Sequence, residues 1–166
     1  FGALSVSDLH GLFEFGLTPT ISTPSAARAV QAAALTARRT VGYHLKIDTG
    51  MNRLGFRHDN LRRTLPELFA SPNLRLTGIY THFATADDAE SDAFGVQRNR
   101  FEQSLSDIAA LGVAPSTACV RHAANSAAVL RDSRTWYDVV RPGLLLYGIV
   151  PPPLASTIPL LLVMSL

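Results

Sequence analysis

Residues 40–50, TVGYHLKIDTG, decide the fold because this strand-like stretch has two different faces. Every second residue is apolar, namely Val41, Tyr43, Leu45 and Ile47. The residues between them are small or polar, namely Gly42, His44, Lys46 and Asp48. Successive side chains of a strand point to opposite faces, so one face is apolar and the other polar. An open parallel sheet covered by helices needs apolar residues on both faces, whereas a closed barrel can turn its polar face inward. The stretch therefore favours a closed α/β barrel.

The remaining sequence alternates strand-like and helix-like stretches. The pattern predicts strands over residues 16–22, 40–50, 74–84, 116–124 and 137–150, and helices over 24–39, 58–71, 94–111 and 125–132. Ser22 or Thr23 can cap the first of these helices ahead of Pro24, and Gly112 ends the third. Strands and helices in strict succession imply a parallel sheet with right-handed crossovers. The predicted fold class is therefore α/β, a (β/α)8 TIM-type barrel.

The alternation breaks near residue 150. The prolines of PPPLASTIP, residues 151–159, indicate a linker. We therefore expect a partial barrel over residues 1–150, and a linker with the first strand of a C-terminal β-domain over residues 151–166. The chain opens without methionine and stops within an apolar run, so we also expect it to be a window onto a longer polypeptide.

Composition narrows the class of protein. Apolar residues make up 47% of the chain, the net charge is only +2, and the arginines are scattered, so we expect no nucleic-acid partner. The longest apolar runs are too short to span a bilayer, so we expect no membrane partner. The single cysteine, Cys119, favours a reducing compartment, and we expect a cytoplasmic protein. His10, His58 and His122 lack ligand spacing with cysteines or acids, so no metal site is expected.

Lys46 is the only lysine, and it lies on the polar face near the predicted carboxyl end of its strand. A solvated lysine is the plain interpretation. A partly desolvated lysine has a lowered pKa, and its amine becomes available for a Schiff base, general-base work or addition of CO2. Arg53 follows the turn at residues 48–50, and its guanidinium either fixes this turn or binds a carboxylate.

Three further segments carry candidate residues. His82 ends the strand GIYTHFA, where it is either a core residue or a flat ring that stacks on a planar cofactor. In HAANSAA, Asn125 and Ser126 either cap a helix or bind an anion. In RPGLLLYG, Arg141 precedes Gly143, whose backbone a phosphate could approach closely. Two consecutive late loops of this kind match the usual phosphate site of a barrel.

In order and spacing, YHLKIDTGMNRLGF, GIYTHFATAD, the Gln97–Phe101 spacing, HAANSAA and VVRPGLLLYG resemble the bacterial alanine racemases, which are fold-type III pyridoxal-phosphate enzymes. The resemblance runs from about Leu17 to the end of the chain. Members of this family have an N-terminal eight-stranded barrel that holds pyridoxal 5′-phosphate, and a C-terminal β-domain. They work as homodimers. The resemblance implies that this chain is the middle and late part of such a barrel, incomplete at its N-terminal side.

The resemblance also implies a role for each candidate. Lys46 matches a second, often carbamylated lysine rather than the Schiff-base lysine, which lies upstream of this window. Arg53 matches the arginine that Lys46 positions and that contacts the substrate carboxylate. The residues implied to bind the cofactor are His82 against its ring, Arg141 at its pyridine nitrogen, Ser126 with the backbone of Gly143 and Leu144 at its phosphate, and Asn125 in support of that loop.

The implied activity is two-base racemisation of L- and D-alanine, which supplies D-alanine for peptidoglycan. The upstream lysine and a tyrosine from the partner's β-domain would be the two bases, and neither lies in these residues. We therefore expect the 166 residues alone to be inactive. Two other functions stay open: an amino-acid racemase of broader specificity, and a single-domain barrel that binds pyridoxal phosphate without racemising. A truncated product is a further possibility.

Overall fold

Strand β2 (Val41–Asp48) lies at the centre of a parallel sheet. The computed structural model describes residues 4–5, 7, 9–112 and 118–150. In this part of the chain, the sheet has the order β1 (Thr20–Ile21), β2, β4 (Leu74–Tyr80) and β5 (Val120–His122). Its strands pair in parallel throughout, as the sequence predicts. The short strand β3 (Phe56–Arg57), which the pattern did not predict, pairs with the end of β2.

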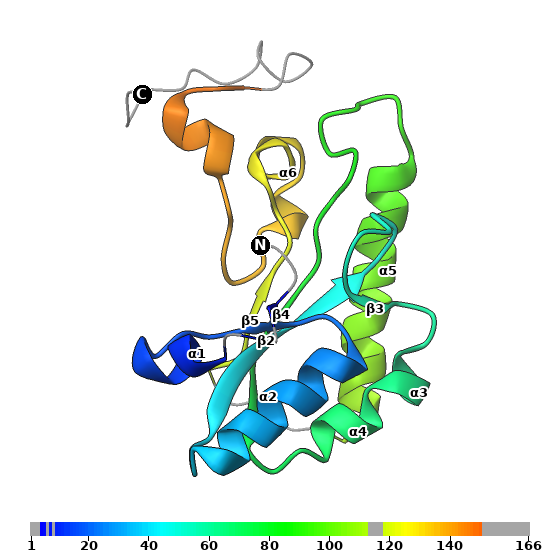
Figure 1. Cartoon of the computed structure of the whole chain (residues 1–166). Coiled ribbons are helices and arrows are strands. Elements are labelled where there is room, and N and C mark those ends of the chain that lie inside the picture. The colour runs from blue at the N-terminus through cyan, green and yellow to red at the C-terminus, as the bar shows by residue number, and fades with distance from the viewer. Residues whose placement is uncertain (1–3, 6, 8, 113–117, 151–166) are drawn as a thin grey trace.

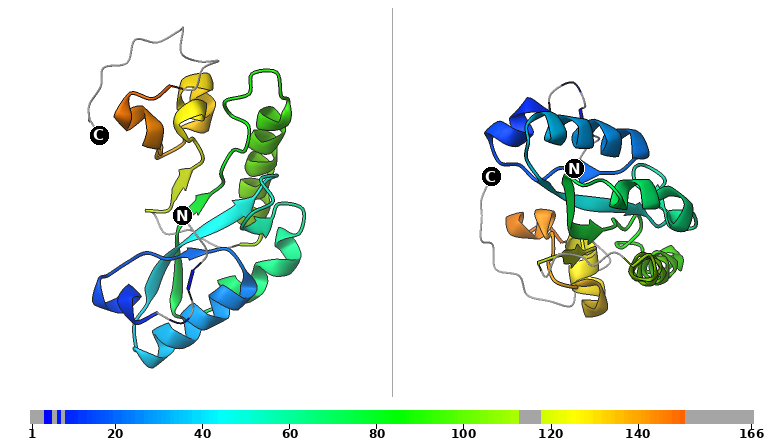
Figure 2. Two further views of the ribbon diagram at one scale, coloured as in Figure 1. Left: turned by 45° about the horizontal axis from the view of Figure 1, so that its top comes forward. Right: turned by 90° about the horizontal axis from the view of Figure 1, so that it is seen from below.

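The helices follow the strands in turn (Figure 1). They are α1 (His10–Glu14), α2 (Pro24–Thr36), α3 (Leu61–Thr64), α4 (Pro66–Phe69), α5 (Ala93–Ala110) and α6 (Ser126–Arg131), with 3-10 helices η1 (Ser133–Thr135) and η2 (Gly143–Tyr147). In the right-hand view of Figure 2, α2 in blue, α3 and α4 in teal, and α5 in light green follow one another around one side of the strands. This arrangement is an arc of a barrel wall. No described helix is long and apolar enough to cross a membrane.

Local sequence explains where the helices begin and end. The Thr23 hydroxyl accepts a hydrogen bond from the Ala26 N–H at 3.1 Å, and Pro24 fills the first turn of α2, as predicted. The predicted helix over residues 58–71 is instead two short helices, because Pro66 has no N–H to continue the first one. The predicted helix over residues 94–111 is confirmed as α5.

The two faces of β2 differ as the alternation predicts. Val41, Tyr43, Leu45 and Ile47 are buried and join the hydrophobic core together with residues of α2, α3, α4 and α5. The other face, which we call the inner face, carries His44, Lys46 and Asp48. The helices therefore cover the outer side of the sheet, and the polar side chains lie on the side that is the interior of a closed barrel.

The predicted strand over residues 137–150 is wrong. The Asp138 N–H donates to the Arg121 carbonyl at 3.1 Å and the Arg141 N–H donates to the Ala124 carbonyl at 3.0 Å, so this segment begins alongside β5. Pro142 then has no N–H to donate, and η2 begins at the next residue. The apolar run GLLLY forms this helix, and Leu144 is 52% exposed. Residues 151–166, where the linker and the next domain are predicted, lie outside the described residues.

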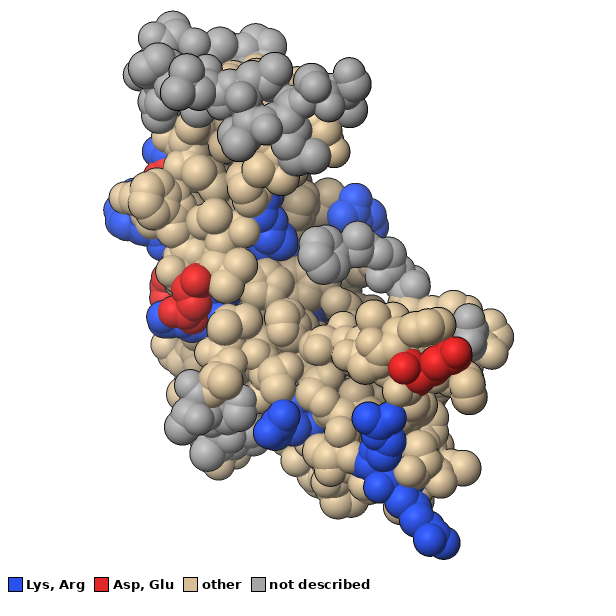
Figure 3. All heavy atoms as spheres, turned by 90° about the vertical axis from the view of Figure 1, so that its left-hand side faces the viewer, with Lys and Arg blue, Asp and Glu red and all other residues tan. Residues whose placement is uncertain are grey.

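Charged side chains on the face shown in Figure 3 do not form a continuous band. Arginine and lysine atoms lie in separate places on this face, with a few acidic side chains among them. The arginines, which are scattered along the sequence, are therefore scattered on this face of the structure as well.

Candidate functional site

The predicted cofactor residues line one cavity of about 400 Å³. It lies beyond the carboxyl ends of β4 and β5, where parallel barrels hold their working residues. The candidates in its wall are His82, Asn125, Ser126, Arg141, Gly143 and Leu144, and Met51, Phe83, Ala84, Asp87 and Ala127 complete it. A volume of this size is sufficient for a small cofactor. Lys46 and Arg53 are not part of its lining.

Arg141 is fixed by acceptors from two strand ends. Its Nη2 donates to the carbonyl oxygens of Thr81 and Ala123 at 2.9 and 3.0 Å. Its Nη1 donates to His122 Nδ1 at 2.8 Å, and Nη2 lies 3.4 Å from His82 Nδ1. Burial lowers the pKa of Arg141, but an arginine remains a cation in proteins. Within the described part of the chain nothing accepts from its Nε–H or its second Nη1–H, so donors remain for a ligand.

The Arg141 guanidinium fixes which ring nitrogen carries the proton in two histidines. Because arginine only donates, His122 Nδ1 accepts and the proton of this imidazole is on Nε2. That N–H donates to His44 Nδ1 at 3.0 Å. Burial, then the charge of Arg141, lowers the pKa of His122 to about 3, and burial lowers that of His44. Both imidazoles are therefore neutral in the folded protein near pH 7.

The His44–His122 pair was not predicted from the sequence, where His122 was considered only as a possible metal ligand. A signal was present, since His44 shares its face of the strand with Lys46 and His122 ends a predicted strand as His82 does. Gly78 makes the pair possible: a Cβ at this position would lie 2.5 Å from the His44 ring. His122 also stacks on Tyr80 with their ring centroids 4.7 Å apart.

Lys46 is 6% exposed, and its amine lies 4.8 Å from the Tyr80 ring centroid. No acid of the described residues lies within ion-pair distance of it. The pKa of Lys46 is lowered to about 8, first because the amine is buried and then because of the charge on Arg141. Asp48 opposes this shift, but its Oδ1 also accepts hydrogen bonds from the N–H groups of Gly50 and Asn52, both at 3.0 Å. A fraction of the amine is therefore neutral near pH 7.

Arg53 lies in the exposed turn after β2. The turn needs unusual backbone: Gly50 and Gly55 have φ of 139° and 127°, and a Cβ at Gly55 would lie 2.6 Å from the Asp48 backbone nitrogen. The charge of Arg53 contributes to lowering the pKa values of Lys46 and His82. In the part of the chain that the structure describes, its guanidinium makes no hydrogen bond or ion pair. It is therefore free to bind a ligand carboxylate.

His82 is neutral as well, because burial, followed by the charges of Arg141 and Lys46, lowers its pKa to about 4. Asn125 caps α6 through its Oδ1, which accepts from the Ala128 N–H at 3.0 Å. The Ser126 hydroxyl oxygen accepts from the Leu145 N–H at 3.2 Å, so the hydroxyl keeps its own proton for a ligand. Asn125 thus has the structural role that the sequence allowed, and Ser126 joins α6 to η2.

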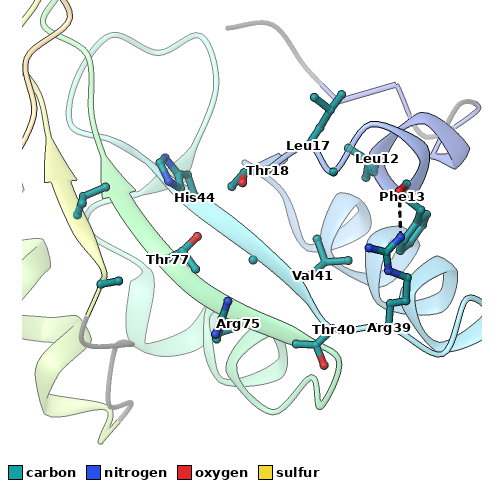
Figure 4. A pocket seen from close by; sticks show the side chains of 14 residues that line it. Leu12, Phe13, Leu17, Thr18, Arg39, Thr40, Val41, His44, Arg75 and Thr77 are labelled. Atoms are coloured by element: carbon teal, nitrogen blue, oxygen red, sulfur yellow. Dashed lines mark hydrogen bonds between the residues drawn. The ribbon is translucent and has the colours of Figure 1, made fainter.

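A second cavity, of about 390 Å³, lies on the inner face near the starts of β2 and β4 (Figure 4). His44, Arg75 and Thr77 face it, and Arg39 beside it donates to the Phe13 carbonyl at 2.9 Å. None of the predicted site residues lines it. It lies toward the amino ends of the strands, away from the edge at which barrels carry out chemistry, so the 400 Å³ cavity is the candidate site.

Comparison with known proteins assigns the family. The family described as "Alanine racemase, N-terminal domain" matches residues 1–151. This chain belongs to that family. An alanine racemase of Carboxydothermus hydrogenoformans is 40% identical over 144 residues, which are 87% of this chain and 38% of that relative. The chain thus spans well under half of the relative's length.

Solved structures agree with this assignment. The alanine racemase of Clostridium difficile 630 superposes with a TM-score of 0.81 at 27% identity, over 91% of this chain and 39% of that one. An alanine racemase of Bacillus anthracis with bound L-Ala-P matches at 34% identity with a TM-score of 0.63, over 87% of this chain and 43% of that one. The described strands and helices are therefore part of a TIM-type barrel, as the alternation of β2 predicts.

Proposed function

We propose that the natural polypeptide containing these residues is an alanine racemase that interconverts L- and D-alanine with pyridoxal 5′-phosphate. The observation that carries this proposal is the 400 Å³ cavity, because its wall includes every residue that the family resemblance assigns to the cofactor. The similarity to named alanine racemases supports the same reaction. The substrate preference for alanine over other amino acids is part of the proposal.

The residues of the cavity fit pyridoxal phosphate. Arg141 has N–H groups left for the pyridine nitrogen, and His82 offers a neutral, flat ring at the cavity wall. Ser126 has a hydroxyl proton for the phosphate, and the Leu144 N–H in the first turn of η2 has no intrahelical acceptor. Apart from its chain neighbours and its own helix backbone, no atom of the described residues lies within 4 Å of the place where a Cβ of Gly143 would stand, so a phosphate could approach this backbone closely.

Each side chain then has a defined task. When bound, pyridoxal phosphate draws electrons from the substrate α-carbon and makes its proton removable. The Arg141 guanidinium would donate to the ring nitrogen, and because arginine does not readily yield its proton, it would keep this nitrogen unprotonated and the ring a weaker electron sink. Arg53 would bind the alanine carboxylate with its fork of donors. The neutral fraction of Lys46 can add CO2, which gives a carbamate and releases a proton, and the carbamate anion would hold Arg53 in place.

The two bases of the proposed reaction match no residue of this chain. We therefore also propose that residues 1–166 alone do not racemise alanine. The two bases would lie in the parts of the natural polypeptide that correspond to the unmatched segments of the relatives. We further propose a homodimer in the cytoplasm that supplies D-alanine for peptidoglycan. The single Cys119, half-buried and unpaired, is compatible with a reducing compartment.

The test begins with the intact mass of the natural polypeptide and its racemase activity on L-alanine, L-serine and L-lysine with added pyridoxal phosphate. We expect a mass about twice that of this chain, alanine as the fastest substrate, and no activity of residues 1–166 expressed alone. Arg141→Lys should lose most of the activity, while Arg134→Lys, which changes an arginine exposed to 73%, should keep it. Faster turnover of serine or lysine would replace the proposal with a broader racemase. Tight binding of pyridoxal phosphate without any racemisation would replace it with a binding barrel.

A further inference from the structure

Residues 81–84, directly after β4, are held by side chains rather than by a neighbouring strand. Their polar backbone contacts reach three side chains, which lie on α5, at the start of α6 and before η2. These contacts are the carbonyls of Thr81 to Arg141 at 2.9 Å, of His82 to Gln97 at 3.1 Å and of Phe83 to Asn125 at 3.4 Å, and the Ala84 N–H to Gln97 at 2.8 Å. The direction in which His82 enters the cavity therefore depends on side chains from distant segments.

Gln97 makes two of these contacts with one amide group. It lies on α5 and is 3% exposed. Its Oε1 accepts from the Ala84 N–H and its Nε2 donates to the His82 carbonyl, so the amide brackets the backbone on both sides of residue 83. The same nitrogen lies 3.2 Å from Thr49 Oγ1, directly after β2. Thr49 in turn contacts Thr81 Oγ1 at 2.7 Å. One side chain thus joins the carboxyl ends of β2 and β4 to α5.

We propose that Gln97 is the positioning residue that sets the His82 ring in the cavity, a role that rests on the proposed function of that cavity. An amide is required because one contact needs an acceptor and the other a donor. Glutamate of the same length keeps the acceptor but turns a carboxylate oxygen toward the His82 carbonyl. Methionine fills a similar volume and makes neither bond. Because the site is buried, water does not replace the lost partner, and the backbone groups are left unsatisfied.

A purely structural role for Gln97 makes a different prediction. If the amide only fastened α5 to the sheet, its loss would lower stability and leave the surroundings of His82 unchanged. If it positions His82, its loss moves the imidazole relative to the positive charges of Arg141, Lys46 and Arg53, which contribute to lowering its pKa. The titration of His82 in the cofactor-free protein therefore separates the two roles, and it does not depend on activity.

The experiment compares Gln97→Met and Gln97→Glu with Ser104→Ala in the intact natural polypeptide. Ser104 is a matched control because it is fully buried on α5 and its hydroxyl donates only to the Arg100 carbonyl of the same helix, at 2.7 Å. Histidine NMR titrations, with the His82 signal identified by its loss in His82→Gln, give one measurement. The dissociation constant of pyridoxal phosphate gives the other, and thermal unfolding shows which variants are folded.

We expect the His82 midpoint to rise by about one pH unit in Gln97→Met and the cofactor to bind about tenfold more weakly, while Ser104→Ala changes neither. Gln97→Glu should shift His82 in the same direction, and it decides the question if the methionine variant does not fold. An unchanged His82 titration in a folded Gln97 variant would overturn the inference. A shifted His82 in a protein that does not bind pyridoxal phosphate at all, wild type included, would support the positioning role and overturn the proposed function.

Discussion

The two faces of β2 differ in what they bury: alternate residues of this one strand place apolar side chains on the outer face and polar side chains on the inner face. On the outer face, Leu45 and Ile47 are fully buried, and both belong to the hydrophobic core. On the inner face, Lys46 is nearly as buried but has a positive charge and no acidic partner among the described residues. Burial stabilises the fold on the outer face, whereas on the inner face burial opposes the charged form of the amine.

This difference separates residues that hold the barrel from residues that give it chemistry. The outer face tolerates no loss of volume, because the helix contacts are close-packed. The inner face has buried polar groups, and replacing one of them by an apolar residue should stabilise the protein. Such a cost in stability is typical of a functional site. Substitutions on the two faces should therefore have opposite effects on stability, and the following predictions test this contrast in the intact natural polypeptide.

The largest effect is expected on the outer face. Leu45→Ala removes a fully buried side chain from the core and should lower the free energy of unfolding by about 2–5 kcal/mol, measured by urea denaturation. Leu35→Ala is the matched control, because Leu35 on α2 is 63% exposed and should change stability by less than about 0.5 kcal/mol. Equal effects of the two substitutions would mean that the outer face of β2 does not face the core.

Below about pH 8, Lys46→Met should raise the free energy of unfolding, whereas Leu45→Ala lowers it. The pKa of Lys46 is lowered from 10.5 to about 8 in the folded protein. Between these values the unfolded chain holds a proton that the folded chain has released, so the free energy of unfolding rises with pH through this window. The rise due to Lys46 should be about 2 kcal/mol between roughly pH 7 and pH 10, and Lys46→Met should lack it.

The measurement is the difference between the pH–stability curves of wild type and Lys46→Met. Lys46 is the only lysine of this chain. The pKa values of Cys119 and Tyr80 are raised, mainly by burial, so both groups act in the opposite direction. Their contribution is common to both proteins and cancels in the difference. Parallel curves would show that the Lys46 amine is not desolvated, and the chemical role proposed for it would then lose its basis.

The sequence predicted these two faces because alternation is a local property. The start of α2 is local as well, because it follows from Thr23 and Pro24. That the candidate residues lie near one another follows instead from the predicted topology. Carboxyl ends of parallel strands meet at one edge of a barrel, so His82, Ser126 and Arg141 could be placed together without any contact being known. The roles proposed for them in binding a cofactor remain predictions.

Contacts between distant residues could not be predicted in this way. Gln97 reads as one more residue of an amphipathic helix, and only the packing of α5 shows its amide against residues 82 and 84. The His44–His122 pair joins two strands that are not neighbours in the sheet. The strand predicted over residues 137–150 failed for a related reason: its apolar run suggested burial, but η2 forms after Pro142 and leaves Leu144 exposed.

A smaller effect is expected where the inner face is crowded. Gly78→Ala places a Cβ against the His44 ring and should break its hydrogen bond with His122, at a cost of about 1–2 kcal/mol because the partly exposed imidazole can swing away. Nitrogen NMR of the histidines should show that His44 loses its fixed Nε2–H form, because its Nδ1 no longer accepts from His122, whereas His122 keeps its form because Arg141 still donates to its Nδ1. Gly95→Ala is the control, because beyond the backbone of α5 no atom of the described residues lies within 4 Å of its added Cβ, and alanine favours the helix. A His44 tautomer that stays fixed in Gly78→Ala would mean that the ring keeps its hydrogen bond to His122 despite the added Cβ.

The smallest effect is expected outside both faces, at the Arg28–Glu67 pair between α2 and α4. The Arg28 Nη1 lies 3.1 and 3.2 Å from the two carboxylate oxygens, but the side chains are 60% and 63% exposed. Water and salt screen such a pair, so a double-mutant cycle with Arg28→Ala and Glu67→Ala should give a coupling below about 1 kcal/mol, which falls further in 1 M salt. A coupling as large as the effect at Lys46 would show that charge, rather than burial of charge, controls stability in this fold. The contrast between the two faces of β2 would then need a different cause.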